Sequence, residues 1–333
     1  MNSTPFSGKR LLSMLLIEAM LMGLMPGSVF ATGEGQTTTV VESTEAPQMG
    51  VPTEEEVPPV VVNPTAEGDV ASLNVNDTET FYANIDDALA AANEAVAAGG
   101  TPETVTLKVL KDAVFAEDSL GYMANGVVAT IALNGLTLDL NGCTLSVNTD
   151  NYYGFSTDEG YTTVLRDSSE GKTGKLECDY RSYQIAGTVN VYGGQVVGTE
   201  GNAAYALLAD TAVLNHYDGI VSHARGIEGV YGGHTSIYGG TFTSYRDFHS
   251  VSKDKLTIYG GTFQDGILIY NNNDYVAPED YLAPGHIFVD ESGNVVTGDA
   301  LGSTTVTVIN CAATVTTTGG DTTICDSFEA AIA

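Results

Sequence analysis

Five residues with the chemistry to bind anions or transfer protons lie close together in the second half of the chain: His223, Arg225, Arg246, Asp247 and His249. Arg225, Arg246 and Glu200 each follow a tyrosine by eight positions. Guanidinium groups bind carboxylate and sulfate oxygens through paired hydrogen bonds, so these residues could contact an acidic polysaccharide. The interpretation that we favour is a ladder of ion pairs between Glu200 and the two arginines.

These tyrosines belong to a repeat that predicts the fold. Four of them recur at nearly constant intervals, each at or just before a turn-prone pair of residues: Tyr192, Tyr217, Tyr238 and Tyr259. Arg166 and Asn141 take the same place in two earlier copies, which makes six consecutive copies. A period of about 20–50 residues is typical of stacked units, and alternating apolar residues indicate short strands. The pattern predicts a parallel β-solenoid with three strands per coil; a β-sandwich is the alternative.

Three columns of side chains are expected to fill the interior. The first column is Leu140, Val191, Ile237 and Ile258, with His216 in the same place. The second is Leu145, Val196, Val221, Phe242 and Phe263, and the third is Ile131, Ile185, Leu208, Ile227 and Val251. Each side chain contributes about 1.5–3 kcal/mol when neighbouring coils cover it. We interpret His216 as a hydrogen-bonded core residue. We expect the tyrosines to stack on one face, where they reinforce the solenoid or bind sugar rings.

The ends of such a stack need covers, because their strand edges would otherwise be unpaired. Residues 84–98 are expected to form an N-terminal capping helix, with Asn84 as its N-cap and apolar residues at helical spacing. Residues 105–270 then carry the coils. Residues 271–300 are expected to form a C-terminal cap with a hairpin around Asp290–Asn294.

Two segments that precede residue 70 are not expected to belong to the fold. Residues 1–31 combine Lys9 and Arg10 with an apolar stretch and a cleavage site after Ala31, which is typical of a secretory signal peptide. Residues 32–69 are rich in proline and acidic residues and lack Lys and Arg, which predicts a disordered stalk. The formal charge of −30 disfavours nucleic acid and anionic membranes as partners. No membrane insertion is expected after signal cleavage.

The C-terminal segment, residues 301–333, is expected to be a linker followed by the truncated start of a second, similar module. The phrase DTTICDSFEAAIA (321–333) echoes DTETFYANIDDALAA (77–91). The four cysteines match no zinc signature: Cys143, Cys178, Cys311 and Cys325. Export permits disulfides, so Cys311 and Cys325 could close a loop. Buried free thiols are the other interpretation.

Several phrases resemble extracellular repeat modules of gut Firmicutes, whose chains are similar to the right-handed parallel β-helix of the pectate-lyase-like superfamily. They are LTLDLNGCTL (136–145), LRDSSEGKTGKL (165–176), the two IYGGTF segments and DYLAPGH. The resemblance covers residues 70–300 and implies an all-β, right-handed parallel β-helix on a bacterial cell surface. The matching phrases are turns and inward strands, and the superfamily includes enzymes, adhesins and proteins without known activity, so the resemblance implies no activity.

The active sites of this superfamily have no match in the sequence. Its polysaccharide lyases resemble one another in pairing an Arg or Lys base with carboxylate-bound calcium, but no carboxylate set accompanies Arg225 and Arg246. Its inverting hydrolases carry Asp pairs on neighbouring coils. Asp139 is followed one and two coils later by Val164 and Asn190, so we expect it to be a surface residue. We predict no catalytic residue, no metal ligand and no cofactor, and a calcium ion has no supporting motif.

The sequence therefore favours a non-catalytic module that serves in adhesion or as a spacer. It is expected to be secreted, or attached to the cell surface through a part of the protein outside this chain. Its expected partners are host or cell-wall glycans or proteins. The alternative is a carbohydrate-active enzyme, a lyase or glycoside hydrolase, or a carbohydrate-binding module that acts on acidic polysaccharide around Arg225 and Arg246.

Overall fold

The computed structural model describes residues 68–325, with gaps at 116–120, 123–128, 148–152, 179–180, 198–202, 245, 272–273, 312 and 317–321. The predicted signal peptide, almost all of the predicted stalk, Glu200, the side chain of Cys325 and residues 326–333 lie outside the described residues. Within the described ranges, no helix is both long enough and apolar enough to cross a bilayer.

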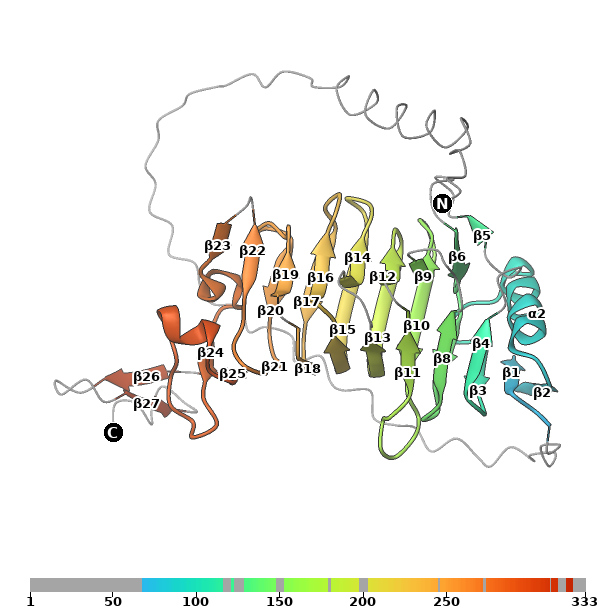
Figure 1. Ribbon diagram of the computed structural model, residues 1–333, viewed down its shortest axis with the longest axis horizontal. Helices are drawn as coiled ribbons and strands as arrows, with labels where there is room; N and C mark the ends of the chain where they lie inside the picture. The colour runs from blue at the N-terminus through green and yellow to red at the C-terminus, as the bar shows by residue number, and fades with distance from the viewer. Residues whose placement is uncertain are drawn as a thin grey trace, which may run out of the picture. The chain divides into compact units, whose positions relative to one another are not determined.

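Parallel strands stack in successive coils and form a β-solenoid of about five turns (Figure 1). The first line of strands is β3 (Val105–Val109), β7 (Thr137–Asp139), β10 (Thr162–Arg166), β13 (Thr188–Val197), β15 (Val213–Ser222), β17 (His234–Ile237) and β20 (Leu256–Ile258). The second line is β4 (Ala113–Phe115), β8 (Thr144–Val147), β11 (Lys175–Glu177), the second halves of β13 and β15, β18 (Thr241–Phe242) and β21 (Thr262–Phe263). The third line is β6 (Ala129–Ala132), β9 (Tyr153–Thr157), β12 (Arg181–Ile185), β14 (Ala203–Leu207), β16 (Arg225–Gly229), β19 (Arg246–His249) and β22 (Ile269–Asn271). The predicted parallel β-solenoid is confirmed.

The first interior column follows the first line of strands. Its members are Leu107, Leu138, Leu165, Val191, His216, Ile237 and Ile258, and all are buried. The last four lie where the sequence predicted them. Leu140 is buried but lies outside this column, because Asp139 rather than Asn141 pairs with Arg166 in the next coil. The predicted copy at Asn141 was therefore two positions out of register.

The other two columns test the remaining predictions. The second column is Ala113, Leu145, Leu176, Val196, Val221, Phe242 and Phe263, which confirms every predicted member and adds two. The third column is Ile131, Phe155, Tyr183, Tyr205, Ile227, Phe248 and Ile269. The prediction was right for Ile131 and Ile227 and wrong for Ile185, Leu208 and Val251. The residues in register at those three places are aromatic and stand two or three positions earlier: Tyr183, Tyr205 and Phe248.

The turn-prone pairs form the corners between the first and second lines of strands. Gly240 and Gly261 have φ angles of 94° and 104°. Asn141 takes the left-handed region with a φ of 49°, which asparagine tolerates better than most residues. Because glycine has no Cβ, it adopts these angles without steric strain, and this explains the second glycine of these pairs.

At the N-terminal end, antiparallel strands and a helix cover the stack (Figure 1). β3 pairs with β1 (Ala71–Val75), β1 pairs with β2 (Thr78–Tyr82), and β5 (Gly121–Tyr122) pairs with β6, all antiparallel. Helix α2 (Ile85–Ala97) contacts β1 and β3 and buries an apolar face. The Asn84 side chain accepts a hydrogen bond of 2.7 Å from Asp86 N. The predicted capping helix and its N-cap are confirmed.

At the C-terminal end, antiparallel strands again replace parallel stacking. β21 pairs with β25 (Val306–Asn310), β25 pairs with β24 (His286–Val289), and β22 pairs with β23 (Asp274–Val276). The predicted turn at Asp290–Asn294 forms, and Asp290 Oδ1 accepts from the backbone N–H groups of Ser292 and Asn294. Its second arm makes only a single bridge to β24, through Val295. The ladder partner of β24 is instead β25, from the segment expected to be a linker.

Candidate functional site

Two of the predicted contact residues lie side by side on the third line of strands. Arg225 in β16 pairs with Arg246 in β19, as their equal distance from the tyrosines predicted. The same ladder pairs Glu228 with His249. In the coil before β16, the ladder partner of Arg225 is Ala203 rather than Glu200, which lies outside the described residues.

Glu228 is the centre of the ion pairs in the described part of this surface. Its Oε2 lies 2.7 Å from Arg181 Nη2, and its Oε1 lies 2.9 Å from Arg225 Nη1 and 3.3 Å from His249 Nδ1. Only 8% of the Glu228 side chain is exposed. The ion pairs in the described part of this surface are therefore made by Glu228, and the predicted ladder with Glu200 stays a prediction because Glu200 lies outside the described residues. These contacts connect strands β12, β16 and β19.

Tyr270 extends this Glu228 network to β22. The guanidinium of Arg246 lies 4.6 Å from the centre of the Tyr270 ring, which is a cation–π contact. The imidazole of His249 stacks on the same ring, with 5.2 Å between ring centres. Burial, followed by the positive charge of Arg225, lowers the pKa of His249, while Glu228 opposes this shift. Sequence reasoning missed Glu228 and Tyr270, although they share with His249 the spacing of the tyrosine repeat.

The other two predicted contact residues are buried. Asp247 has no exposed surface; its Oδ2 accepts a hydrogen bond of 2.9 Å from Leu268 N, and its Oδ1 has no partner among the described residues. Burial raises the pKa of Asp247 to about 8, so its carboxyl group is protonated at neutral pH. His223 is 6% exposed, and its Nδ1 accepts from Ala224 N at 3.1 Å. Both side chains therefore belong to the buried part of the solenoid rather than to its exposed surface.

Replacing Glu228 by glutamine is expected to lower the free energy of unfolding by about 2–3 kcal/mol. The amide keeps the shape of the side chain but removes the negative charge between two guanidinium groups in a buried setting. Denaturant unfolding measures this change. The control is Lys253→Gln, which breaks a pair whose side chains are 64% and 58% exposed and should cost less than about 1 kcal/mol. Equal losses in the two variants would contradict the structural role of Glu228.

Asp139 is a correction to the sequence analysis. It was expected at the surface with Val164 in the neighbouring coil, but it is 1% exposed, and its ladder partners are Lys108 and Arg166. The Nε of Arg166 donates to Asp139 Oδ2 at 3.2 Å. The two-position error in register explains why Val164 was expected beside Asp139 instead of Arg166. Asp139 is buried because its carboxylate binds the Arg166 side chain and the backbone N–H groups of Asn141 and Ser168.

Asp167 is a second buried carboxylate, one coil after Asp139, that sequence reasoning missed. Its Oδ1 accepts from Gly142 N at 2.8 Å, and its Oδ2 accepts from Gly174 N at 2.6 Å. Asp139 Oδ1 likewise accepts from the backbone N–H groups of Asn141 and Ser168. Because both carboxylates are engaged by backbone donors, they hold the corner turns in place.

His216 is a core residue, as predicted. It is fully buried, and its Nδ1 lies 3.0 Å from the carbonyl oxygen of Gly239 in the next coil. Its ring lies between Tyr205 and Phe242, with ring centres 6.1 and 5.3 Å away. Burial lowers the pKa of His216 to about 4, so the imidazole is neutral over most of the pH range in which it would usually titrate.

The four tyrosines of the repeat form a continuous stack. Successive ring centres are 4.7, 4.7 and 4.8 Å apart, and the ring planes differ by 3°, 7° and 9°. At one end of the stack, the rings of His286 and Tyr259 form a T-shaped pair with 5.9 Å between centres. The faces of the inner rings are thus covered by other rings, whereas sugars bind to exposed aromatic faces. This geometry favours reinforcement of the solenoid.

Within the described ranges, no group of three or more His, Cys, Asp or Glu residues is placed to hold a metal ion. Comparison of the chain with protein-family models gives no match, and comparisons with curated proteins and with solved structures give none either.

Proposed function

We propose that this chain is a secreted or cell-surface β-solenoid module that acts without catalysis, in adhesion or as a spacer. The observation that carries the proposal is that the Glu228 carboxylate contacts Arg181, Arg225 and His249 while only 8% of its side chain is exposed. A general acid or base must reach its substrate and exchange a proton with it. A carboxylate held by three neighbours is suited instead to joining β12, β16 and β19.

The location outside the cell is proposed from residues 1–31 and 32–69, whose compositions are those of a signal peptide and a stalk. A second module is proposed within residues 301–333. In support, β26 (Ala313–Thr316) and β27 (Thr322–Cys325) form an antiparallel pair, as β1 and β2 do. Modules repeated along a chain are suited to a spacer that projects a binding surface.

We further propose that the coils are right-handed. Connections between parallel strands of one sheet are right-handed in about 98% of cases. The phrases that resemble extracellular modules of gut Firmicutes support the same choice, since the superfamily that those modules resemble is right-handed. A crystal structure of residues 70–310 with left-handed coils would contradict this part of the proposal.

The arginines support a second candidate function, binding or cleavage of an acidic polysaccharide. Arg225 and Arg246 are ladder neighbours, and Arg181 shares Glu228 with Arg225. Burial keeps the nearby carboxyl group of Asp247 protonated, so guanidinium groups outnumber ionised carboxylates among these residues. In a chain with a formal charge of −30, such a cluster is a local attraction for anions.

Replacing both ladder arginines distinguishes the two candidates. The whole chain, Arg225→Ala/Arg246→Ala, and a control with the same charge change, Lys172→Ala/Lys253→Ala, are incubated with polygalacturonate and with a sulfated glycan. We expect no unsaturated or reducing ends to be released, and equal glycan retention by the two double variants once thermal unfolding shows that both are folded. Turnover by the unmodified chain that is lost only in the arginine variant would overturn the proposal in favour of the second candidate.

A further inference from the structure

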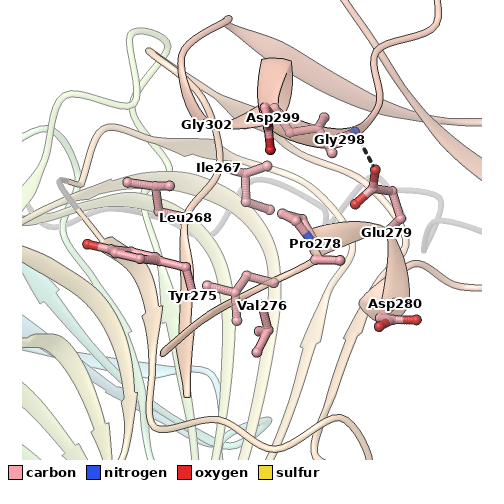
Figure 2. Close-up of a pocket in the computed structure, with 13 residues that line it drawn as sticks. Ile267, Leu268, Tyr275, Val276, Pro278, Glu279, Asp280, Gly298, Asp299 and Gly302 are labelled. Carbon is pink, nitrogen blue, oxygen red and sulfur yellow. Dashed lines mark hydrogen bonds between the residues drawn. The ribbon is translucent and has the colours of Figure 1, made fainter. Parts of the chain in front are cut away.

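The C-terminal cap contains a cavity of about 490 Å³ that is separate from the Glu228 network (Figure 2). Its walls come from β23, from the 3-10 helices η2 (Pro278–Tyr281) and η3 (Gly298–Gly302), and from residues 267–269, which lead into β22. Cavities of about 300–1,000 Å³ are typical of sites that bind small ligands. The volume is therefore sufficient for a side chain together with part of its backbone.

Aliphatic side chains form much of the wall of this cavity. Ile267 and Leu301 are each 1% exposed, and Leu268 and Val276 also line it. Tyr275 stands on one side and is 48% exposed (Figure 2). Such a wall gains free energy when an apolar chain covers it. It offers few partners to the hydroxyl groups of a sugar.

The rim of the cavity is acidic. Glu279 Oε1 accepts a hydrogen bond of 2.7 Å from Gly298 N, whereas its Oε2 is buried and has no hydrogen-bond partner among the described residues. Figure 2 shows Asp299 on the same side of the cavity as Gly298. Asp280 also belongs to the rim and is paired with Lys253 at 2.7 Å. None of the described residues that line the cavity is basic, so the cavity attracts positive charge.

We infer that this cavity binds a lysine or arginine side chain of a partner polypeptide. The aliphatic stem would lie along Ile267, Leu268 and Val276, and its cationic end would donate to Glu279 Oε2 and to Asp299. A buried carboxylate oxygen without a donor is costly, and a bound cation removes this cost. An amino sugar carries the same charge but would place hydroxyl groups against an aliphatic wall. A polypeptide with an exposed lysine or arginine would thus be the partner in the proposed adhesion role, on which this inference rests.

Calorimetric titration of the whole chain with two short peptides tests the inference. One peptide has lysine between two leucines, and the other has norleucine in place of the lysine, so the two differ in the ammonium group. We expect the lysine peptide to bind about tenfold more tightly. This advantage should disappear in Glu279→Gln/Asp299→Asn. It should remain in Glu94→Gln/Glu170→Gln, which removes the same charge from two exposed positions.

A second variant blocks the cavity without changing its charge. Gly302 lines the cavity, and a Cβ added there would lie 3.4 Å from Leu268 Cδ2, in ordinary contact. We expect Gly302→Leu to fill the cavity and to weaken binding of both peptides.

Several results would overturn the inference: equal binding of the two peptides, binding of neither, or an unchanged lysine advantage in Glu279→Gln/Asp299→Asn. Tighter binding of a glucosamine oligomer than of the lysine peptide would also overturn it, because the cavity would then be a sugar site. The proposed function would be contradicted by a different result, namely turnover of polysaccharide by the whole chain. The peptide titration does not measure such turnover, so the two failures can be told apart.

Discussion

Changing Gly239 to alanine is expected to destabilise the solenoid by about 3 kcal/mol. At this corner the N–H groups of Tyr238 and Gly239 both donate to the carbonyl oxygen of His216, at 2.8 and 3.3 Å, which draws two coils together. A Cβ at Gly239 would lie 2.3 Å from the carbonyl oxygen of Tyr217. Because that oxygen belongs to the backbone, it cannot rotate away, so the coils must separate and weaken the hydrogen bonds at the corner.

Thermal or denaturant unfolding measures this effect, and the chain offers matched comparisons. Gly260→Ala should give a similar loss, because its Cβ would lie 2.2 Å from the carbonyl oxygen of Tyr238. Gly68→Ala is the control: no atom lies within 4 Å of the added Cβ, and we expect a change within about 0.5 kcal/mol. A Gly239→Ala chain as stable as the Gly68→Ala chain would contradict the close stacking of the corners.

Replacing Asp247 by asparagine is expected to remove a loss of stability that the unmodified chain shows as the pH rises. Burial raises the pKa of Asp247 from 3.8 to about 8, although its carboxylate accepts from Leu268 N. At pH values between 3.8 and about 8, the Asp247 carboxyl group keeps its proton in the folded chain and releases it in the unfolded chain. The free energy of unfolding therefore falls by about 1.4 kcal/mol for each pH unit from about 4 to about 8. Asparagine has no proton to release in this range.

The measurement is denaturant unfolding of both chains at several pH values inside this window. The difference between them isolates Asp247, because all other titrating groups are shared. A second variant, Asp247→Ala, also loses the acceptor for Leu268 N–H, so it should be less stable than Asp247→Asn by a constant amount at every pH. A difference between the unmodified chain and Asp247→Asn that does not change with pH would contradict a buried, protonated carboxyl group.

His216 has the opposite effect on stability. Its pKa is lowered by burial from 6.5 to about 4, so the unfolded chain binds a proton in this range that the folded chain excludes. The stability that depends on His216 is complete above about pH 6.5 and is lost as the pH falls towards 4. Between about pH 4 and 6.5 the slopes from His216 and Asp247 therefore oppose each other, and above pH 6.5 that of Asp247 acts alone.

Much of the coil was predictable from the sequence because it follows from local backbone geometry. The step from Tyr217 to Tyr238 equals the step from Tyr238 to Tyr259. The strands of these coils can therefore be aligned with one another in only one register. The tyrosine stack and the second column were therefore correct. Likewise, Asn84 was identified as a helix cap because capping involves a residue and its near neighbours.

The errors lie where coil length varies. The alignment of Asn141 with Arg166 failed because that coil is longer, and this error placed Val164 rather than Arg166 beside Asp139. In the third column, the aromatic side chain of Tyr183 took the place expected for Ile185. A shift in register changes which residues are neighbours in adjacent coils, and a shift by an odd number also changes which face of a strand is buried, so uneven loops defeat a prediction based on periodicity.

The sequence by itself thus determined the period, the glycine corners, the N-terminal cap and the inward path of two columns, since each depends on residues close together in the chain. Only the tertiary structure decided that Glu228 joins Arg181 to His249, and that β23, η2 and η3 line an acidic cavity. Those contacts join segments that meet only after the coils have stacked. Their geometry is set by the hydrogen-bond register of the whole stack, which no single segment encodes.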